Sequence, residues 1–348
     1  MSVRIIIWTF LGLAISMIAC TSDNKVEAPD VSDVQLNYEV ARFEQMLLSM
    51  DTTKVIEELE RIELQYPAFS EIFFMQVLPL KDVDSQETFY IGIRDFIKNP
   101  YIQSVLKKIN DKYGDFSEST KELDLAFKYY QHYFPQWEAP NVYTFISDFG
   151  YQAFMFDDRG KDGIGIGLDL FLAPEFDYKS LDPTNAAFSD YLTRSFTKEH
   201  ITKRVMEQLL DDKMGVVKGN KLIDHMVHNG KKLYLLDLFL PAKHDTIVHE
   251  YSEKQLKWCE QNEINIWAYF LDKKMLYSTD PQMANRYTRP APTSRNLPAD
   301  SPGRTGNFLG LKIVNAYVKN NPTENIIDML SLTDGTEFLK KSNYKPPK

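Results

Sequence analysis

The stretch NVYTFIS at residues 141–147 decides the fold of this chain, because helical periodicity gives way there to residues that favour β-strands. Two further stretches are of the same kind, YQAFMF at residues 151–156 and IGIGLDLFL at residues 164–172. The cluster DDRGKDG at residues 157–163 lies between them and is typical of a turn. We therefore expect a small, mostly antiparallel sheet of three strands over residues 141–172.

Helices are predicted on both sides of this sheet. Before it, apolar residues such as Val40, Phe43 and Leu47 recur every three or four positions, which indicates amphipathic helices within residues 36–135. After it, the same spacing returns within residues 183–348. The clearest predicted helices cover residues 86–97, 100–112, 117–133, 217–229, 231–239, 252–275, 281–286, 305–320 and 323–331. The predicted fold class is α+β and mostly helical, with the sheet between helical blocks.

This order of helices, strands and a long helix is that of a zinc-peptidase catalytic domain. In such a domain the helix after the sheet carries H-E-x-x-H, whose imidazoles bind zinc and whose glutamate is the general base. Here His200 stands at the first ligand position, Ile201 at the base and Arg204 at the second ligand position. Isoleucine accepts no proton and arginine stays cationic, so zinc hydrolysis is not expected at this helix. The position of a third ligand, one helix later, holds Asn229. We therefore predict a degenerate zincin-like core with a relict groove at His200, Arg204 and Asn229.

The other histidines leave a second hypothesis open. His225 and His228 are three residues apart on one predicted helix, so with carboxylates they could form the noncanonical site of a metal-dependent hydrolase. Surface or hydrogen-bonded histidines are the alternative interpretation. Cys259 lies in a predicted helix and is interpreted as a buried, inert thiol. No catalytic residue, cofactor or metal ligand is assigned, and the preferred prediction is that the chain is not an enzyme.

Arg304 lies in the segment SPGRTG at residues 301–306, where the predicted helix 305–320 begins. One interpretation is a binding loop, in which Arg304 and the free N–H groups of the helix start receive an anion. The other is a glycine-assisted turn into the helix, with Gly310 packed tightly against a neighbour.

The first residues predict export and lipid attachment. Arg4 is the only charged residue among the first twenty, and the apolar run after it, about 15 residues, is shorter than a transmembrane helix. Small residues and Cys20 follow this run. We interpret residues 1–19 as a lipoprotein signal peptide, Cys20 as the lipid-bearing residue and residues 20–35 as a polar tether. A single globular domain is expected over residues 36–348.

Composition and charge exclude further function classes. The formal net charge is −9 and the basic residues are dispersed, so nucleic acid is not predicted as a partner. No second apolar run is long enough to span a membrane. With Cys20 lipidated, Cys259 is the one cysteine left, so no intramolecular disulfide is expected.

A series of segments along nearly the whole chain carries a resemblance to a known family. They are Cys20, YTFISDF (143–149), IGLDLFL (166–172), GKKLY (230–234), EINIW (263–267), LYST (276–279), SPGRTG (301–306) and SNYKP (342–346). In these segments and their order the chain resembles the gliding-motility lipoprotein B family (GldB) of the Bacteroidetes. That family is distantly similar to zinc-peptidase-like domains, and the resemblance supplies no catalytic residues.

The resemblance implies a role in gliding motility or the associated envelope secretion machinery, whose proteins are the expected partners. We expect a non-enzymatic lipoprotein, held by its lipid in the outer membrane and facing the periplasm, that binds or scaffolds envelope proteins. No small-molecule substrate is predicted. The stretch at residues 164–172 is predicted to be an edge strand that accepts an extended peptide.

The binding and hydrolase hypotheses differ in the metal content of the purified protein. We expect folded protein to be free of zinc, because the ligand positions hold Arg204 and Asn229. Elemental analysis of the purified chain measures this, and one zinc per chain would support the hydrolase instead.

Overall fold

The computed structural model describes residues 28–80 and 84–347. The described residues from Val31 onward belong to one compact unit. The predicted signal peptide, Cys20 and part of the predicted tether lie outside the described residues, so these stay predictions. Among the described helices, none has the length and apolar character needed to cross a membrane.

The chain before the sheet is helical except for one short strand, β1 (Val40–Arg42). Its helices are α1 (Phe43–Ser49), α2 (Val55–Gln65), α3 (Pro67–Ile72), the π-helical turn η1 (Phe73–Val77), α4 (Gln86–Lys98), α5 (Pro100–Tyr113) and α6 (Ser117–Tyr133). The last three confirm the helices predicted at 86–97, 100–112 and 117–133. Local capping explains their starts: the Ser85 hydroxyl accepts from the Thr88 amide before α4, and the Asn99 side chain accepts from the Tyr101 amide before α5.

Four strands form the sheet, in the order β1-β2-β4-β3. β2 (Asn141–Phe145) pairs in parallel with β1 and with β4 (Lys161–Gly167), whereas β3 (Ala153–Asp158) pairs antiparallel with β4. The sheet is therefore mixed, and the prediction of a mostly antiparallel sheet is wrong. Strand-forming residues identify a strand without specifying its direction, and β2 does not continue into β3 as a hairpin.

Two further predictions about the sheet are corrected. β1 lies in a stretch predicted to be helical; with three residues it is too short to interrupt the apolar spacing of its surroundings. β4 lies between β2 and β3, so residues 164–172 do not form an edge strand that could accept a peptide. Its continuation is a 3-10 helix, η2 (Leu168–Phe171).

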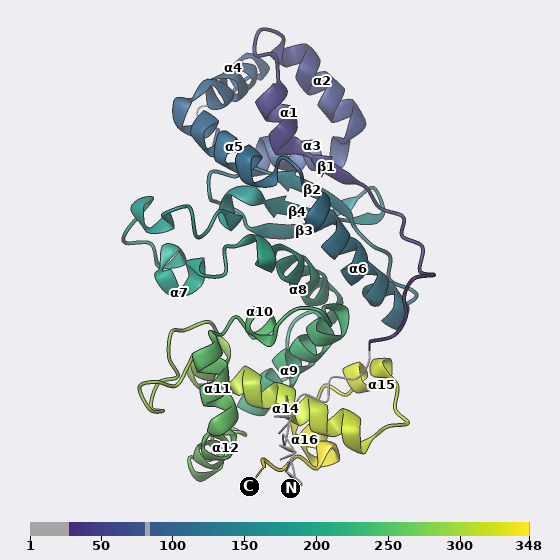
Figure 1. The fold of residues 1–348 in the computed structure, drawn as a ribbon, viewed down its shortest axis with the longest axis vertical. Coiled ribbons are helices and arrows are strands. Elements are labelled where there is room, and N and C mark those ends of the chain that lie inside the picture. The colour runs from purple at the N-terminus through teal and green to yellow at the C-terminus, as the bar shows by residue number, and fades with distance from the viewer. Residues whose placement is uncertain (1–27, 81–83, 348) are drawn as a thin grey trace, which may run out of the picture. The chain divides into compact units, whose positions relative to one another are not determined.

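Aromatic side chains join the sheet to the helices around it. α1–α5 lie on one side of the sheet and α8 on the other (Figure 1). The ring of Phe69 in α3 stacks on Tyr143 in β2 with 4.6 Å between the ring centroids, and Phe43 meets Phe69 edge-on. A Cβ atom on Gly165 would lie 2.9 Å from the Phe154 ring. Glycine at this position of β4 therefore leaves room for the aromatic layer.

The chain after the sheet is again helical. Its elements are η3 (Tyr178–Ser180), η4 (Ala186–Phe188), α7 (Asp190–Thr193), η5 (Lys198–His200), α8 (Ile201–Met214), α9 (Leu222–Phe239), α10 (Asp245–His249), α11 (Glu253–Gln261), α12 (Glu263–Asp272), α13 (Pro281–Thr288), α14 (Thr305–Asn320), α15 (Ile326–Ser331) and α16 (Gly335–Ser342). The structure confirms the helix predicted at 305–320. The two helices predicted at 217–229 and 231–239 are one helix, and the one predicted at 252–275 is divided at Asn262.

Helix α9 belongs to two apolar cores. Leu235 and Phe239, near its end, pack in the core around the sheet, while Ile223 and Met226 pack in a second core with α11–α14 and α16. α9 and α14 cross at close range: a Cβ atom on Gly310 would lie 1.9 Å from the Met226 carbonyl oxygen. This contact confirms the tight packing expected of Gly310, because any side chain there would separate the two helices.

A strained turn follows β2. Asp148 and Phe149 both adopt left-handed backbone conformations, with φ of 53° and 63°, which are costly for residues other than glycine. The carboxylate of Asp169, which is fully buried, holds this turn by accepting hydrogen bonds from the Ser147 amide at 3.0 Å and the Phe149 amide at 2.7 Å. Burial raises the pKa of Asp169 to about 6, against the opposing effect of these amides.

We predict that Asp169→Ala destabilises the fold strongly, because it leaves two buried amides unpaired, at about 1–3 kcal/mol each. Asp169→Asn keeps an acceptor and is expected to lose less. The raised pKa means that the folded protein holds a proton on Asp169 that the unfolded chain releases near pH 4, so stability falls as the pH rises toward 6.

Denaturant unfolding of the wild type and the Asn variant at several pH values between 4 and 7 tests this mechanism. The Asn variant should gain stability relative to the wild type as the pH rises, since asparagine does not ionise. A difference that stays constant over this range would contradict the assignment to Asp169.

Candidate functional site

Two of the three residues that were assigned to the relict groove, His200 and Arg204, lie at the start of α8. His200 is the last residue of η5 and is 8% exposed; its Nδ1 lies 2.9 Å from the Thr197 hydroxyl oxygen. Burial lowers the pKa of His200 to about 4, and the nearby Glu250 carboxylate only partly opposes this. At neutral pH the imidazole is therefore uncharged.

Arg204 lies one helical turn further on and its guanidinium bridges two carboxylates. Its Nη1 is 2.6 Å from an oxygen of Glu207, and its Nη2 is 2.9 Å from an oxygen of Glu250. Lys203, whose side chain is 2% exposed, bonds to the same two carboxylates at 2.8 Å each. Residues three and four apart share a helix face, so α8 presents two cations and one carboxylate toward Glu250.

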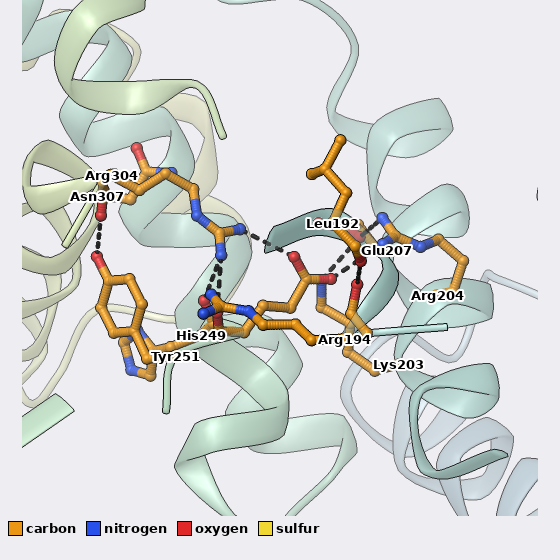
Figure 2. A network of polar contacts seen from close by, with 12 residues as sticks. Leu192, Arg194, Lys203, Arg204, Glu207, His249, Tyr251, Arg304 and Asn307 are labelled. Carbon is orange, nitrogen blue, oxygen red and sulfur yellow. Dashed lines mark hydrogen bonds and ion pairs between the residues drawn. The ribbon is translucent and has the colours of Figure 1, made fainter. Parts of the chain in front are cut away.

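Arg304 reaches the same carboxylate from the turn before α14. Its Nη1 lies 3.0 Å from the second oxygen of Glu250, and its Nη2 donates to the carbonyl oxygen of His249 at 2.9 Å. Arg204 and Arg304 approach the shared carboxylate from opposite directions (Figure 2). Arg194 adds a hydrogen bond to the Glu250 carbonyl oxygen. We call Arg194, Lys203, Arg204, Glu207, Glu250 and Arg304 the Glu250 cluster.

Glu250 and Arg304, the two loop residues of the cluster, both have unusual backbone conformations. Glu250 follows α10 with φ 52° and ψ 42°, and Arg304 precedes α14 with φ 59° and ψ 25°. Both are left-handed conformations that residues with a Cβ atom rarely adopt. The ion pair between them opposes that strain, because the side chains of Glu250 and Arg304 are largely buried, at 11% and 12% exposed.

Cations outnumber carboxylates in this cluster. Burial by itself would raise the pKa of Glu250, but Lys203, Arg204 and Arg304 hold that pKa well below its usual range. Lys203 and Arg204 lower the pKa of Glu207 in the same way, again against the effect of burial. Both carboxylates are therefore ionised at neutral pH and bonded to cations of the protein, which leaves neither available as a proton acceptor.

Asn229 lies apart from these residues in its hydrogen bonding. Its side-chain amide donates to the Asn307 side chain at 2.9 Å, and Asn307 in turn donates to the carbonyl oxygen of Thr288. Asn229 thus takes part in the contact between α9 and α14. Of the sequence-predicted residues, the structure brings together His200, Arg204 and Arg304, which were assigned to two separate features.

Glu207 and Glu250 are the functional residues that sequence reasoning missed. Glu207 had a local signal, since Lys203 and Arg204 precede it by four and three positions on one helix. Glu250 had none, because its partners Arg204 and Arg304 are 46 and 54 positions away.

The remaining candidate residues, His225, His228 and Cys259, do not form a metal or nucleophile site among the described residues. Within residues 28–80 and 84–347, no three histidine, cysteine, aspartate or glutamate side chains are grouped as metal ligands. Burial lowers the pKa of both His225 and His228, that of His228 to about 4. Cys259 is buried, as predicted, and burial raises the pKa of its thiol to about 12. Such a thiol stays protonated and is a poor nucleophile.

Comparison with known proteins identifies one family. The family model described as "Gliding motility protein GldB" matches residues 24–346. No curated protein and no solved structure matches the chain. The resemblance found in the sequence is thereby confirmed, whereas the similarity to zinc-peptidase domains stays a hypothesis.

We predict that Glu250→Gln lowers the free energy of unfolding by about 3–5 kcal/mol, because it leaves the buried cations of Lys203, Arg204 and Arg304 without their shared counter-charge. Chemical denaturation measures the loss. The matched control is Glu253→Gln, the same change at an exposed position three residues away, which should alter stability by less than about 0.5 kcal/mol. If Glu250→Gln lowered the free energy of unfolding no more than Glu253→Gln does, the cluster would not stabilise the fold.

Proposed function

The chain belongs to the family of the gliding motility protein GldB, and on this premise we propose that it is a non-enzymatic lipoprotein that binds or scaffolds envelope proteins of the gliding or associated secretion machinery. The Glu250 cluster is the observation that carries this proposal. The side chains of this cluster are bonded to one another, so they act as internal supports of the fold.

A hydrolytic site needs a group that can accept a proton from water. Glu207 and Glu250 are each bonded to two or more cations, and their pKa values are held low. The Nδ1 of His200 is bonded to Thr197, and burial lowers the pKa of His200 to about 4, which makes its imidazole a weak base. The same contacts join α8, which packs on the sheet, to the start of α14, which packs in the second core. A body of two linked cores suits a scaffold.

Anchoring by lipid at Cys20 would place this body at a membrane surface. Several large apolar side chains are available for partners at that surface, because Leu64, Met75 and Tyr277 are 86%, 64% and 54% exposed. Single exposed apolar side chains are common on protein surfaces, so these three serve as positions at which partner contact can be probed. The proposed position is the outer membrane, facing the periplasm.

We predict that His200→Asn leaves motility unchanged, because asparagine supplies a polar atom near the position of Nδ1 and no catalytic imidazole is required. Cys20→Ser is expected to abolish motility by releasing the protein from the membrane. Colony spreading, together with the amount of each variant in the membrane fraction, measures both effects. Loss of motility in His200→Asn at wild-type protein levels would contradict a non-enzymatic role.

The binding role is tested by photo-crosslinking in intact cells. A photoreactive residue at Leu64, Met75 or Tyr277 should give a discrete adduct with an envelope protein, and the exposed polar position Lys257 on α11 is the control. Adducts at none of the three apolar positions would count against partner binding through them.

A further inference from the structure

A cavity lies between the end of α6, the link from α8 to α9, helix α9 and helix α15. Its volume is about 300 Å³. Most of its wall is apolar, with Trp137 after α6, Met214 at the end of α8 and Leu330 in α15 among the contributing residues. The elements that enclose it come from both halves of the chain (Figure 1). Pockets of this size and character are typical of small-molecule sites.

Lys231 in α9 supplies a buried positive charge to this cavity. The residue is 4% exposed, and its Nζ donates to the carbonyl oxygen of Leu332 at 2.7 Å and, at 3.4 Å, to that of Leu330. The ammonium also lies 4.6 Å from the centre of the Phe338 ring. No carboxylate of the described residues pairs with it, and burial lowers the pKa of Lys231 to about 8. A buried ammonium without a counter-charge is costly, so an anion beside it would be stabilising.

The other titratable groups of the wall leave this charge unbalanced. Lys213 is paired with Asp162 and Asp212 outside the wall, and Lys218 is exposed. Asp224, the acidic residue of the wall, accepts from the backbone amides of Lys221 and Gly335.

His228 adds no charge to the wall. Burial lowers the pKa of its imidazole to about 4, so it is neutral at physiological pH. The wall therefore combines apolar surface with an excess of positive charge.

We propose that this cavity binds a small amphiphilic carboxylate. Its carboxylate would accept a hydrogen bond from the Nζ of Lys231, and its apolar part would pack on Trp137, Met214 and Leu330. A cavity of about 300 Å³ holds on the order of ten non-hydrogen atoms at roughly 30 Å³ for each water-sized unit. Octanoate has this size. A neutral ligand of equal size leaves the ammonium unpaired, and a cationic one is repelled.

Titration of octanoate into the full chain, purified in detergent, tests the proposal. Calorimetry, corrected by a titration into the detergent alone, should show one site. We expect Lys231→Met, which keeps the length and removes the charge, to weaken binding at least tenfold. Lys218→Met is the matched control, the same change at the exposed rim, and should weaken binding less than threefold because solvent screens that charge. Thermal unfolding verifies that both variants are folded.

A second variant fills the cavity and leaves Lys231 in place. Leu330→Trp adds bulk to the wall and should abolish octanoate binding while the protein stays folded. In the wild type, affinity should fall as the pH rises from 7 to 9, because Lys231 loses its proton while octanoate stays ionised. Burial opposes the charge of Lys213, but its two aspartates raise the pKa of this lysine, so it keeps its charge throughout this range.

Three results would overturn the proposal. They are equal binding of octanoate by the wild type and Lys231→Met, binding of octan-1-ol as tight as that of octanoate, and tighter binding of a short peptide with a free C-terminal carboxylate. The first result would show that the Lys231 ammonium does not contribute to binding. The second would show that the carboxylate of the ligand does not contribute. The third assigns the cavity to a protein terminus, which would make it part of the proposed partner-binding function.

Discussion

The carboxylate of Glu250 is the contact on which the arrangement of the two cores depends. Removing a charge from water is costly, and a buried ion is tolerated only where partners of opposite charge surround it. Glu250 meets this condition with Lys203 and Arg204 from α8 and Arg304 from the start of α14. None of these three cations is fully neutralised without it. One side chain in the turn after α10 thus links α8, which packs on the sheet, to the start of α14, which packs in the second core.

The same contact supports the proposal that this face of α8 serves the fold rather than peptidase chemistry. A helix that presents residues four apart on one face can direct two imidazoles at a metal. Here the corresponding positions hold His200 and Arg204, and the face is completed by Lys203 and Glu207. An arginine occupies space beside carboxylates as a metal ion would, but it neither polarises water nor leaves a coordination position open. The geometry is therefore suited to fixing the fold.

Features with local sequence signals could be predicted, whereas features that depend on contacts between distant segments could not. The helix at 305–320 was predicted to the residue, because apolar spacing and the glycine turn before it are local signals. Arg204 and Arg304 were singled out for unusual local context, yet their common partner Glu250 carries no such context. The predicted direction of strand pairing was wrong for the same reason. Strand propensity is a local property, whereas the parallel pairing of β2 with Lys161–Gly167 depends on how distant segments meet.

Two buried lysines show how partners decide whether a charge is structural or receptive. Lys203 and Lys231 have nearly the same small exposure, yet Lys203 bonds to two carboxylates, whereas Lys231 has two carbonyl oxygens and an aromatic ring. Carbonyl dipoles and a ring stabilise an ammonium less than a full negative charge does. The charge of Lys203 is therefore already balanced by carboxylates of the protein. The charge of Lys231 is not balanced in this way, and Lys231 lies on the wall of the cavity that we propose as the carboxylate site.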